Sequence, residues 1–217
     1  MTKKNDGIGV GELARSKLIQ AALDLFGRRG LDGVSIRQIS DRAGMNVASI
    51  SYHFGSKDNL YSAVADYINE QISLHAKVPV EAATKFISSH DRDASNAMEH
   101  ILSIVGITID LMIPDSEETE QWARFITRFQ LGEHIPDHEL SRNPLHDLLA
   151  VLVAIVRKQP NSNLENAIIA QTIFGQMLVF RVNRLSAKNL LGITAYGPAE
   201  VSQIKQIVFS NIQKTLS

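Results

Sequence analysis

The chain has 217 residues, a formal net charge of −1 and 44% hydrophobic residues, a composition typical of a globular protein with one or two buried cores. It contains no cysteine, which excludes disulfides, thiolate nucleophiles, cysteine-ligated zinc and redox sensing through thiols. No apolar run reaches the roughly 20 residues that cross a bilayer, and residues 1–17 lack the apolar stretch of a secretory signal. We therefore expect a cytoplasmic protein without a membrane partner.

Charge is unevenly distributed along the chain. Residues 1–60 carry nine Lys and Arg against six Asp and Glu, whereas residues 61–217 carry 13 against 17. A basic N-terminal part on an acidic remainder favours contact with nucleic acid at the N-terminal end. Because an excess of three positive charges is modest, two copies of the chain would strengthen such binding.

Two helices are predicted in the first 45 residues. The first spans about Glu12–Arg29 and carries apolar residues at helical spacing. The second begins after Ser35, whose hydroxyl can cap the free amides of the first turn. It ends at Ala43, because Gly44 suits the left-handed residue of a tight turn. The residues expected to face inward are Leu18, Ala22, Leu25 and Phe26 on the first helix and Ile36, Ile39 and Ala43 on the second.

A third short helix is predicted after Asn46, which is a good N-cap residue. Ala48, Ile50 and Phe54 are expected to face the body of the domain. The remaining side chains are small, hydroxyl-bearing or aromatic and carry little charge, which suits a helix that lies in a groove.

Short helices joined by a glycine turn predict a helix-turn-helix, whose second helix enters the major groove of DNA while the first braces against the phosphates. Arg37 is expected to bind a guanine or a phosphate, and Val47 and Ala48 to touch thymine methyl groups. Lys57 adds a positive charge on the same side. The spacing alone is equally typical of an ordinary two-helix corner. The residues expected to contact DNA are Ser35, Arg37, Asn46, Val47, Ala48, Ser49, Ser51, Tyr52, His53 and Lys57.

Two runs, ARSKLIQAALDLFGRRGLDGVSIRQIS and AGMNVASISYHFGSKDNLYSAV, make residues 14–64 similar to the N-terminal domain of the TetR/AcrR transcriptional regulators. The resemblance implies a dimeric repressor whose DNA affinity is lowered by a small ligand bound in the other domain. The chain departs from the family at Ser51, where a tyrosine is usual, so the operator sequence cannot be carried over. The run NVASISYHF, with FGQ and FR-x-x-R near the C-terminus, resembles a narrower branch that includes antibiotic-responsive regulators.

The rest of the chain is predicted to be helical, which gives an all-α fold. We expect a three-helix DNA-binding domain at residues 1–60 and a larger ligand-binding and dimerisation domain at 61–217. The fourth helix is expected over Ser56–Lys77, ended by Pro79, and links the two domains. Further helices are expected at about 93–112, 117–131, 144–158, 164–190 and 198–216, with breaks near Pro114, Pro136, Pro160 and Gly197.

The predicted helices at 144–158 and 164–190 are apolar on more than one face, which favours burial on both sides. One side can pack on the core and the other on a second subunit, giving a four-helix dimer interface to which Gly175 allows close approach. A central helix in a monomer explains the same pattern. A two-fold dimer would require a palindromic operator.

Effector pockets are mostly apolar with a few polar groups that orient the ligand. A buried arginine at 128 or 181 would favour an anionic ligand, although a surface ion pair explains either residue equally well. The ligand itself stays unnamed, and no cofactor is predicted. The candidate effector contacts are Asp110, Met112, Trp122, Phe125, Arg128, Phe129, Gln130, Gln176, Phe180, Arg181 and Arg184.

A metal-dependent function and an enzyme are the two other classes of function to consider. His134 and His138 have a spacing that would join two imidazoles on a helix, with Asp137, Glu139 and His146 nearby, but Pro136 makes a regular helix doubtful. An enzyme is not expected, because the chain lacks a G-x-S-x-G elbow, a phosphate-binding glycine loop and an H-E-x-x-H motif. A regulator that activates transcription, or that responds to metal, stays an alternative to a repressor.

Overall fold

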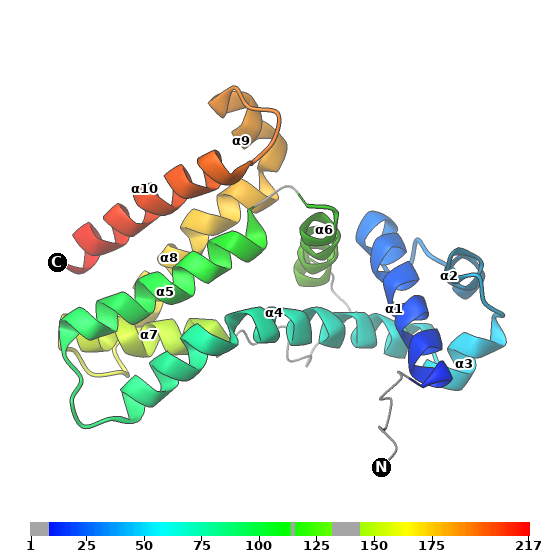
Figure 1. The fold of residues 1–217 in the computed structure, drawn as a ribbon, viewed down its shortest axis with the longest axis horizontal. Coiled ribbons are helices and arrows are strands. Elements are labelled where there is room, and N and C mark those ends of the chain that lie inside the picture. Colours follow the sequence, from blue (N-terminus) through cyan, green and yellow to red (C-terminus); the bar gives the residue numbers. More distant parts are fainter. Residues whose placement is uncertain (1–8, 114–115, 132–143) are drawn as a thin grey trace, which may run out of the picture. The chain divides into compact units, whose positions relative to one another are not determined.

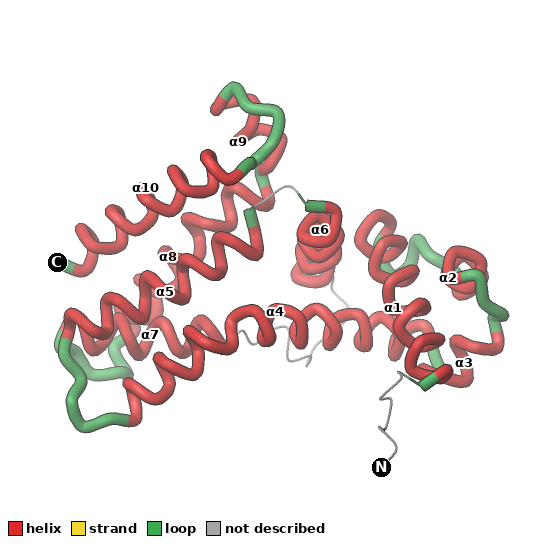
Figure 2. Tube along the Cα trace, in the orientation of Figure 1, coloured by secondary structure: helices red, strands yellow, loops and turns green. Residues whose placement is uncertain are grey.

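The computed structural model describes residues 9–113, 116–131 and 144–217, and every regular element within these ranges is a helix (Figure 1, Figure 2). This confirms the predicted all-α fold. In chain order the helices are α1 (Val10–Arg29), α2 (Ile36–Ala43), α3 (Ala48–Phe54), α4 (Lys57–Ser88), α5 (Ala94–Met112), α6 (Glu117–Leu131), α7 (Pro144–Arg157), α8 (Leu164–Val182), α9 (Arg184–Leu191) and α10 (Pro198–Leu216).

By its internal packing, the chain divides into two compact units. The first comprises residues 1–69 and 124–138, and the second comprises residues 70–123 and 139–217. Helices α1, α2 and α3 belong to the first unit, and α5, α7, α8, α9 and α10 to the second, while α4 and α6 each contribute a part to both. The division of DNA binding from ligand binding after residue 60 stays a prediction.

Aromatic rings form the centre of the first unit. Phe26 on α1 meets Tyr61 on α4 edge to face, with 5.0 Å between ring centroids. Tyr61 also stacks on Phe129 of α6 at 5.7 Å and packs against Phe125 at 4.8 Å. Burial raises the pKa of the Tyr61 phenol, which therefore stays neutral at physiological pH. Of the predicted inward residues of α1, Leu18, Ala22 and Phe26 are fully buried and Leu25 is partly buried.

A buried carboxylate joins α1 to α2. Asp24 on α1 accepts a hydrogen bond from Arg28 Nε at 2.6 Å and another from Arg42 Nη2 on α2 at 3.2 Å. A buried charge is tolerated only where charged or hydrogen-bonding partners compensate its desolvation. Asp24 therefore fixes how the first helix of the helix-turn-helix sits against α1.

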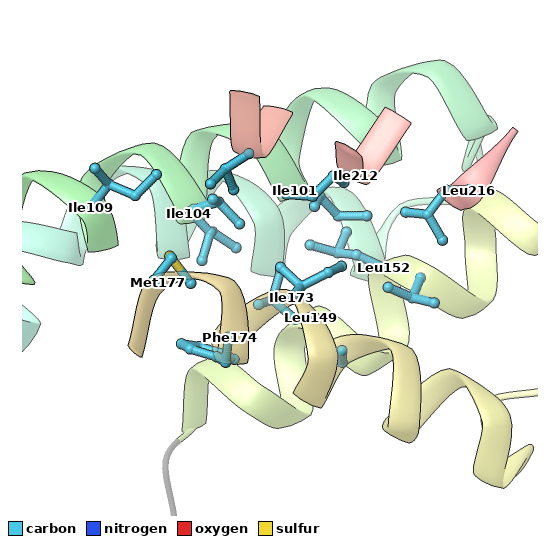
Figure 3. Close-up of a cluster of buried hydrophobic side chains, with 14 of the residues drawn as sticks. Ile101, Ile104, Ile109, Leu149, Leu152, Ile173, Phe174, Met177, Ile212 and Leu216 are labelled. Carbon is cyan, nitrogen blue, oxygen red and sulfur yellow. The ribbon is translucent and has the colours of Figure 1, made fainter. Parts of the chain in front are cut away.

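The core of the second unit lies among α5, α7, α8 and α10 (Figure 3). The labelled side chains from these four helices point toward one another and are mostly branched aliphatic groups, which pack at high density. The labelled residues are Ile101, Ile104, Ile109, Leu149, Leu152, Ile173, Phe174, Met177, Ile212 and Leu216.

The prediction that Pro79 ends the fourth helix is wrong, since α4 continues through Pro79 to Ser88. A proline inside a helix removes one hydrogen-bond donor and disfavours the preceding turn. Ala76 and Ala83 lie seven residues apart on the same side of α4, and both are buried. Tertiary packing of this face therefore outweighs the cost of the proline.

A single long helix over residues 164–190 is also wrong. The chain leaves helical geometry at Asn183, whose φ is −102° and ψ 34°, so α8 ends at Val182 and α9 begins at Arg184. Asparagine competes with regular helix by bonding to nearby backbone groups, which favours a break at this position. The last turn of α9 ends at Gly192 in the left-handed conformation.

Candidate nucleic-acid interface

The ends of α2 are fixed by local hydrogen bonds that the sequence predicted. Ser35 Oγ accepts a hydrogen bond from Gln38 N at 3.2 Å, and Gln38 Oε1 accepts one from Ser35 N at 2.9 Å. This reciprocal capping box satisfies two amides that the helix itself cannot. At the other end Gly44 takes the left-handed conformation, with φ 66° and ψ 36°, so the predicted tight turn is confirmed.

Helix α3 buries one side against the first unit. Ile50 and Phe54 are buried, and the Arg15 guanidinium lies 5.3 Å from the centre of the Phe54 ring. Asn46 Oδ1 accepts a hydrogen bond from Ala48 N at 3.0 Å, which supports its predicted capping role. Ala48 is exposed, however, and its predicted inward orientation is wrong. It precedes Ile50 by two residues, a rotation of about 200° around the helix, and therefore lies opposite the buried side.

The side of α3 that faces away from the first unit is exposed. Tyr52 is 83% exposed, and its ring meets His53 edge to face at 4.9 Å. Ser51 and Ala48 are also exposed, and Arg37 is exposed on α2. Val47, Ser49 and His53 are partly buried. Apart from Lys57, the residues predicted to contact DNA thus lie on or beside the exposed parts of α2, the turn and α3.

Lys57 has an internal role. Its ammonium group donates to Leu31 O at 2.9 Å and to Val34 O at 3.2 Å, two carbonyls of the segment between α1 and α2. These bonds hold that segment against the start of α4. The cation is therefore engaged within the first unit and is better described as positioning the helix-turn-helix.

Four residues predicted as effector contacts belong to the first unit, and Gln130 is one of them. Arg128 on α6 donates from Nε to Gly27 O at 3.0 Å and from Nη2 to Arg28 O at 2.9 Å, so it satisfies carbonyls at the C-terminal end of α1. Phe125 and Phe129 pack around Tyr61. Their environment is that of a core, and nothing about it favours a ligand.

The other effector candidates occupy different settings within the second unit. Asp110 is exposed, and its Oδ2 forms an ion pair with Lys205 Nζ at 2.6 Å. Gln176 accepts a hydrogen bond from Asn211 at 3.2 Å and lines a surface groove of about 450 Å³ between α8 and α10, together with Phe180. Trp122 and Arg181 are buried. Met112 is partly buried, and Arg184 donates a hydrogen bond to Ile113 O.

Several residues that the sequence did not single out shape the interface. Asp24 is one, although its spacing of four from Arg28 is a signal for an ion pair on a helix. Gly33 is another, because a Cβ there would lie 2.3 Å from Arg29 O. The close approach of these two segments leaves room only for glycine, and no local pattern announces it.

The proposed metal ligands His134 and His138 lie outside the described residues. Within the described residues there is no group of three or more His, Asp or Glu side chains that could hold a metal ion. No single helix in the described part of the chain is both long and apolar enough to cross a membrane.

Comparison with known proteins assigns this geometry to a family. Residues 18–64 match the bacterial regulatory proteins of the tetR family, and residues 97–217 match the C-terminal domain of the HTH-type transcriptional dual regulator CecR. The CecR protein of Shigella flexneri is 32% identical over 214 residues, which cover 95% of this chain and 92% of CecR. The chain belongs to the TetR family. It is therefore a DNA-binding transcriptional regulator and not an enzyme.

Other proteins that resemble the chain are also named as transcriptional regulators. The HTH-type transcriptional repressor Rv3405c of Mycobacterium tuberculosis is 34% identical over 89 residues, which cover 40% of this chain and 47% of Rv3405c. A transcriptional regulator from Rhodococcus sp. Rha1 has the same fold, with a TM-score of 0.61 at 15% identity over 93% of this chain and 96% of its own. A TetR/AcrR-type regulator from Aquifex aeolicus has a TM-score of 0.54 at 13% identity over 93% and 99% of the two chains.

Proposed function

We propose that this TetR-family protein is a homodimeric repressor that binds a palindromic operator and is released from it by a small-molecule effector. The observation that carries the proposal is the exposed side of α3, where a tyrosine is 83% exposed beside small and hydroxyl-bearing residues. A helix with this surface at the end of a tight turn fits the major groove.

Within this proposal the predicted DNA contacts take two kinds of role. Ser35 accepts a hydrogen bond from a backbone amide at the start of α2, and Asn46 does the same at the start of α3. Lys57 holds the segment between α1 and α2. Arg37 binds a guanine edge or a phosphate from α2. The side chains proposed to lie in or beside the groove are Val47, Ala48, Ser49, Ser51, Tyr52 and His53.

The proposed dimer surface lies on α8, α9 and α10. Leu164, Ile168, Val179 and Val182 are exposed and share one side of α8 with Gly175, at which an added Cβ would meet no atom within 4 Å. Exposed apolar stripes of this kind mark protein interfaces. The sequence placed the interface on the helices at 144–158 and 164–190, but the described part of α7 adds no exposed large apolar side chain. The surface continues through Leu185, Leu190, Leu191 and Ile207.

The direction of regulation is supported by the relatives. The Mycobacterium tuberculosis relative is named a repressor, and the Shigella flexneri relative is named a dual regulator. The protein acts as a repressor where its operator overlaps a promoter, and as an activator where the operator lies upstream of the promoter. A reporter assay that can register either an increase or a decrease in transcription distinguishes the two.

The test is selection of fragments of the source genome by the purified protein at near-physiological salt, followed by sequencing. We expect a palindrome whose half-sites are separated by about one or more turns of DNA. Binding of that fragment should weaken steeply with salt, because phosphate contacts release counterions. If no fragment is enriched by a protein that is dimeric in the same buffer, the proposed function is overturned.

A further inference from the structure

Arg181 on α8 is a buried cation that has no counter-ion among the described residues. Its side chain is 9% exposed, and no hydrogen bond or ion pair joins it to any described residue. Its Nη2 is fully buried and has no acceptor. A buried guanidinium normally has carboxylate or carbonyl partners, since desolvation of an unpaired charge is costly. Among the described residues, this strong hydrogen-bond donor is thus left unsatisfied.

Other cations of the second unit show the usual arrangement. Arg157 lies 2.8 Å from Glu165 Oε2, and its Nη1 also donates to Asn166 Oδ1 at 2.8 Å. Lys205 lies 2.6 Å from Asp110 Oδ2. Both cations are more exposed than Arg181, yet both have an acid partner. The contrast shows that Arg181, unlike these two cations, has no acid partner among the described residues.

The charged group that acts on Arg181 is a second arginine, Arg184. Arg184, one turn further along the chain, donates to Ile113 O at 2.8 Å, and its guanidinium lies 5.0 Å from the centre of the Tyr196 ring. The Lys188 ammonium lies 5.6 Å from the same ring. Burial, and then the charge of Arg184, lower the pKa of Arg181 to about 10, so the guanidinium is still charged at neutral pH. This concentration of positive charge attracts an anion.

Close to Arg181, the buried side of α8 is apolar. Phe174 and Met177 precede Arg181 by seven and four residues on the buried side of α8, and both are buried. A buried, unsatisfied guanidinium beside apolar side chains suits a ligand that has an apolar body and an acceptor-rich end.

We propose that Arg181 binds the oxyanion of the effector, a carboxylate or a phosphate carried on an apolar body. This rests on the proposed function, because it names the chemistry of the molecule that releases the DNA. A guanidinium offers two parallel N–H donors to such a group, and the pair is strong where water is excluded.

The test uses phenylacetate, phenyl phosphate and the neutral phenylacetamide with the full-length chain. Thermal unfolding and calorimetric titration are measured for the unchanged protein, for Arg181→Met and for the control Arg157→Met. We expect one or both anions to raise the melting temperature of the unchanged protein, and the amide to have no effect. Which anion acts separates a carboxylate from a phosphate. In Arg181→Met the anion affinity should fall at least tenfold, whereas Arg157→Met should keep it.

A second readout separates a ligand-binding arginine from a structural one. Without added anion, Arg181→Met should melt at the same temperature as the unchanged protein or higher, because the substitution removes an unpaired buried charge. Arg157→Met, which breaks an ion pair, should melt lower. The proposal is overturned if Arg181→Met melts lower and the three probes act on it as on the unchanged protein.

The result of the anion-binding test at Arg181 does not depend on the result of the genomic selection. If a genomic fragment is enriched but the anions act alike on the unchanged protein and Arg181→Met, only the proposal about the effector fails. If anions bind through Arg181 and no fragment is enriched, the repressor proposal fails and the anion site stands.

Discussion

Tyr52 presents its hydroxyl to solvent from the exposed side of α3, while the edge of its ring packs against His53. Because the hydroxyl contributes nothing to the core, Tyr52→Phe should leave the free energy of unfolding unchanged. Loss of one hydrogen bond to DNA should weaken operator binding by about 1 kcal/mol, roughly fivefold. Fluorescence anisotropy with the selected operator measures this, and Tyr67→Phe on α4 is the matched control. Equal affinity for Tyr52→Phe and the unchanged protein would remove Tyr52 from the interface.

A substitution of the single residue Arg37 distinguishes contact with a base from contact with a phosphate. If it binds a guanine, Arg37→Ala should cost about 1–3 kcal/mol and relax specificity at one base pair of each half-site. If it binds a phosphate, affinity should fall for all sequences alike and the salt slope should decrease by about one. Titrations at several salt concentrations, with operators changed one base pair at a time, separate these cases. Arg92→Ala in the second unit, an exposed arginine away from the helix-turn-helix, should behave as the unchanged protein.

At the scale of elements, α2 is held at its N-terminus by the reciprocal bonds between Ser35 and Gln38. Ser35→Ala removes the side-chain acceptor and should lower the free energy of unfolding by about 1 kcal/mol. Urea unfolding followed by circular dichroism measures the change. The control is Ser16→Ala, an exposed serine within α1, which should leave stability unchanged or slightly raised because alanine is the better helix former. A Ser35→Ala protein as stable as the control would contradict the cap.

The elements also show which features a sequence reveals. The start of α2 at Ser35 and its end at Gly44 follow from local chemistry, so both were predicted correctly. The bonds from Lys57 to Leu31 and from Arg128 to Gly27 join residues 26 and 101 positions apart. No local pattern specifies such partners. The sequence therefore predicts that Lys57 contacts DNA and that Arg128 contacts the effector, whereas both side chains bind backbone carbonyls. The continuation of α4 through residue 79 likewise depends on packing, which outweighs a local helix-breaking signal.

Among the candidate sites, the exposed surface of α3 is the one that helical geometry indicates most directly, while its contact with DNA stays a prediction. The exposed residues of α3 are Ala48, Ser51 and Tyr52, and helical geometry separates them from the buried Ile50 and Phe54. The effector candidates come from several helices, and their assignment requires knowing which core each helix enters. Phe125 and Phe129 had the same apolar appearance as Phe180, yet they pack around Tyr61 in the first unit. Helical periodicity does not decide whether an arginine is buried or finds a partner, so the sequence predicts an anionic ligand at Arg181 only if that residue is buried.

At the scale of the whole molecule, the proposed function makes operator binding depend on two copies of the chain. Val182 is 60% exposed within the apolar stripe on α8. In the proposed dimer, Val182→Asp would bury an unpaired carboxylate at the interface, which should cost about 3 kcal/mol or more, a hundredfold or greater rise in the dimer dissociation constant. Analytical ultracentrifugation over a concentration series measures this constant, and Val78→Asp on α4, also an exposed valine, is the control.

The same variant connects assembly to function. A monomer presents one recognition helix and reaches only one half of a palindrome, so Val182→Asp should lose most of its operator affinity at concentrations where the unchanged protein is dimeric. Raising the protein concentration should restore binding, because mass action restores the dimer. Binding to an isolated half-site should be unaffected, since the surface of α3 is intact. A Val182→Asp protein that remains dimeric and binds the full operator normally would place the interface elsewhere on the chain.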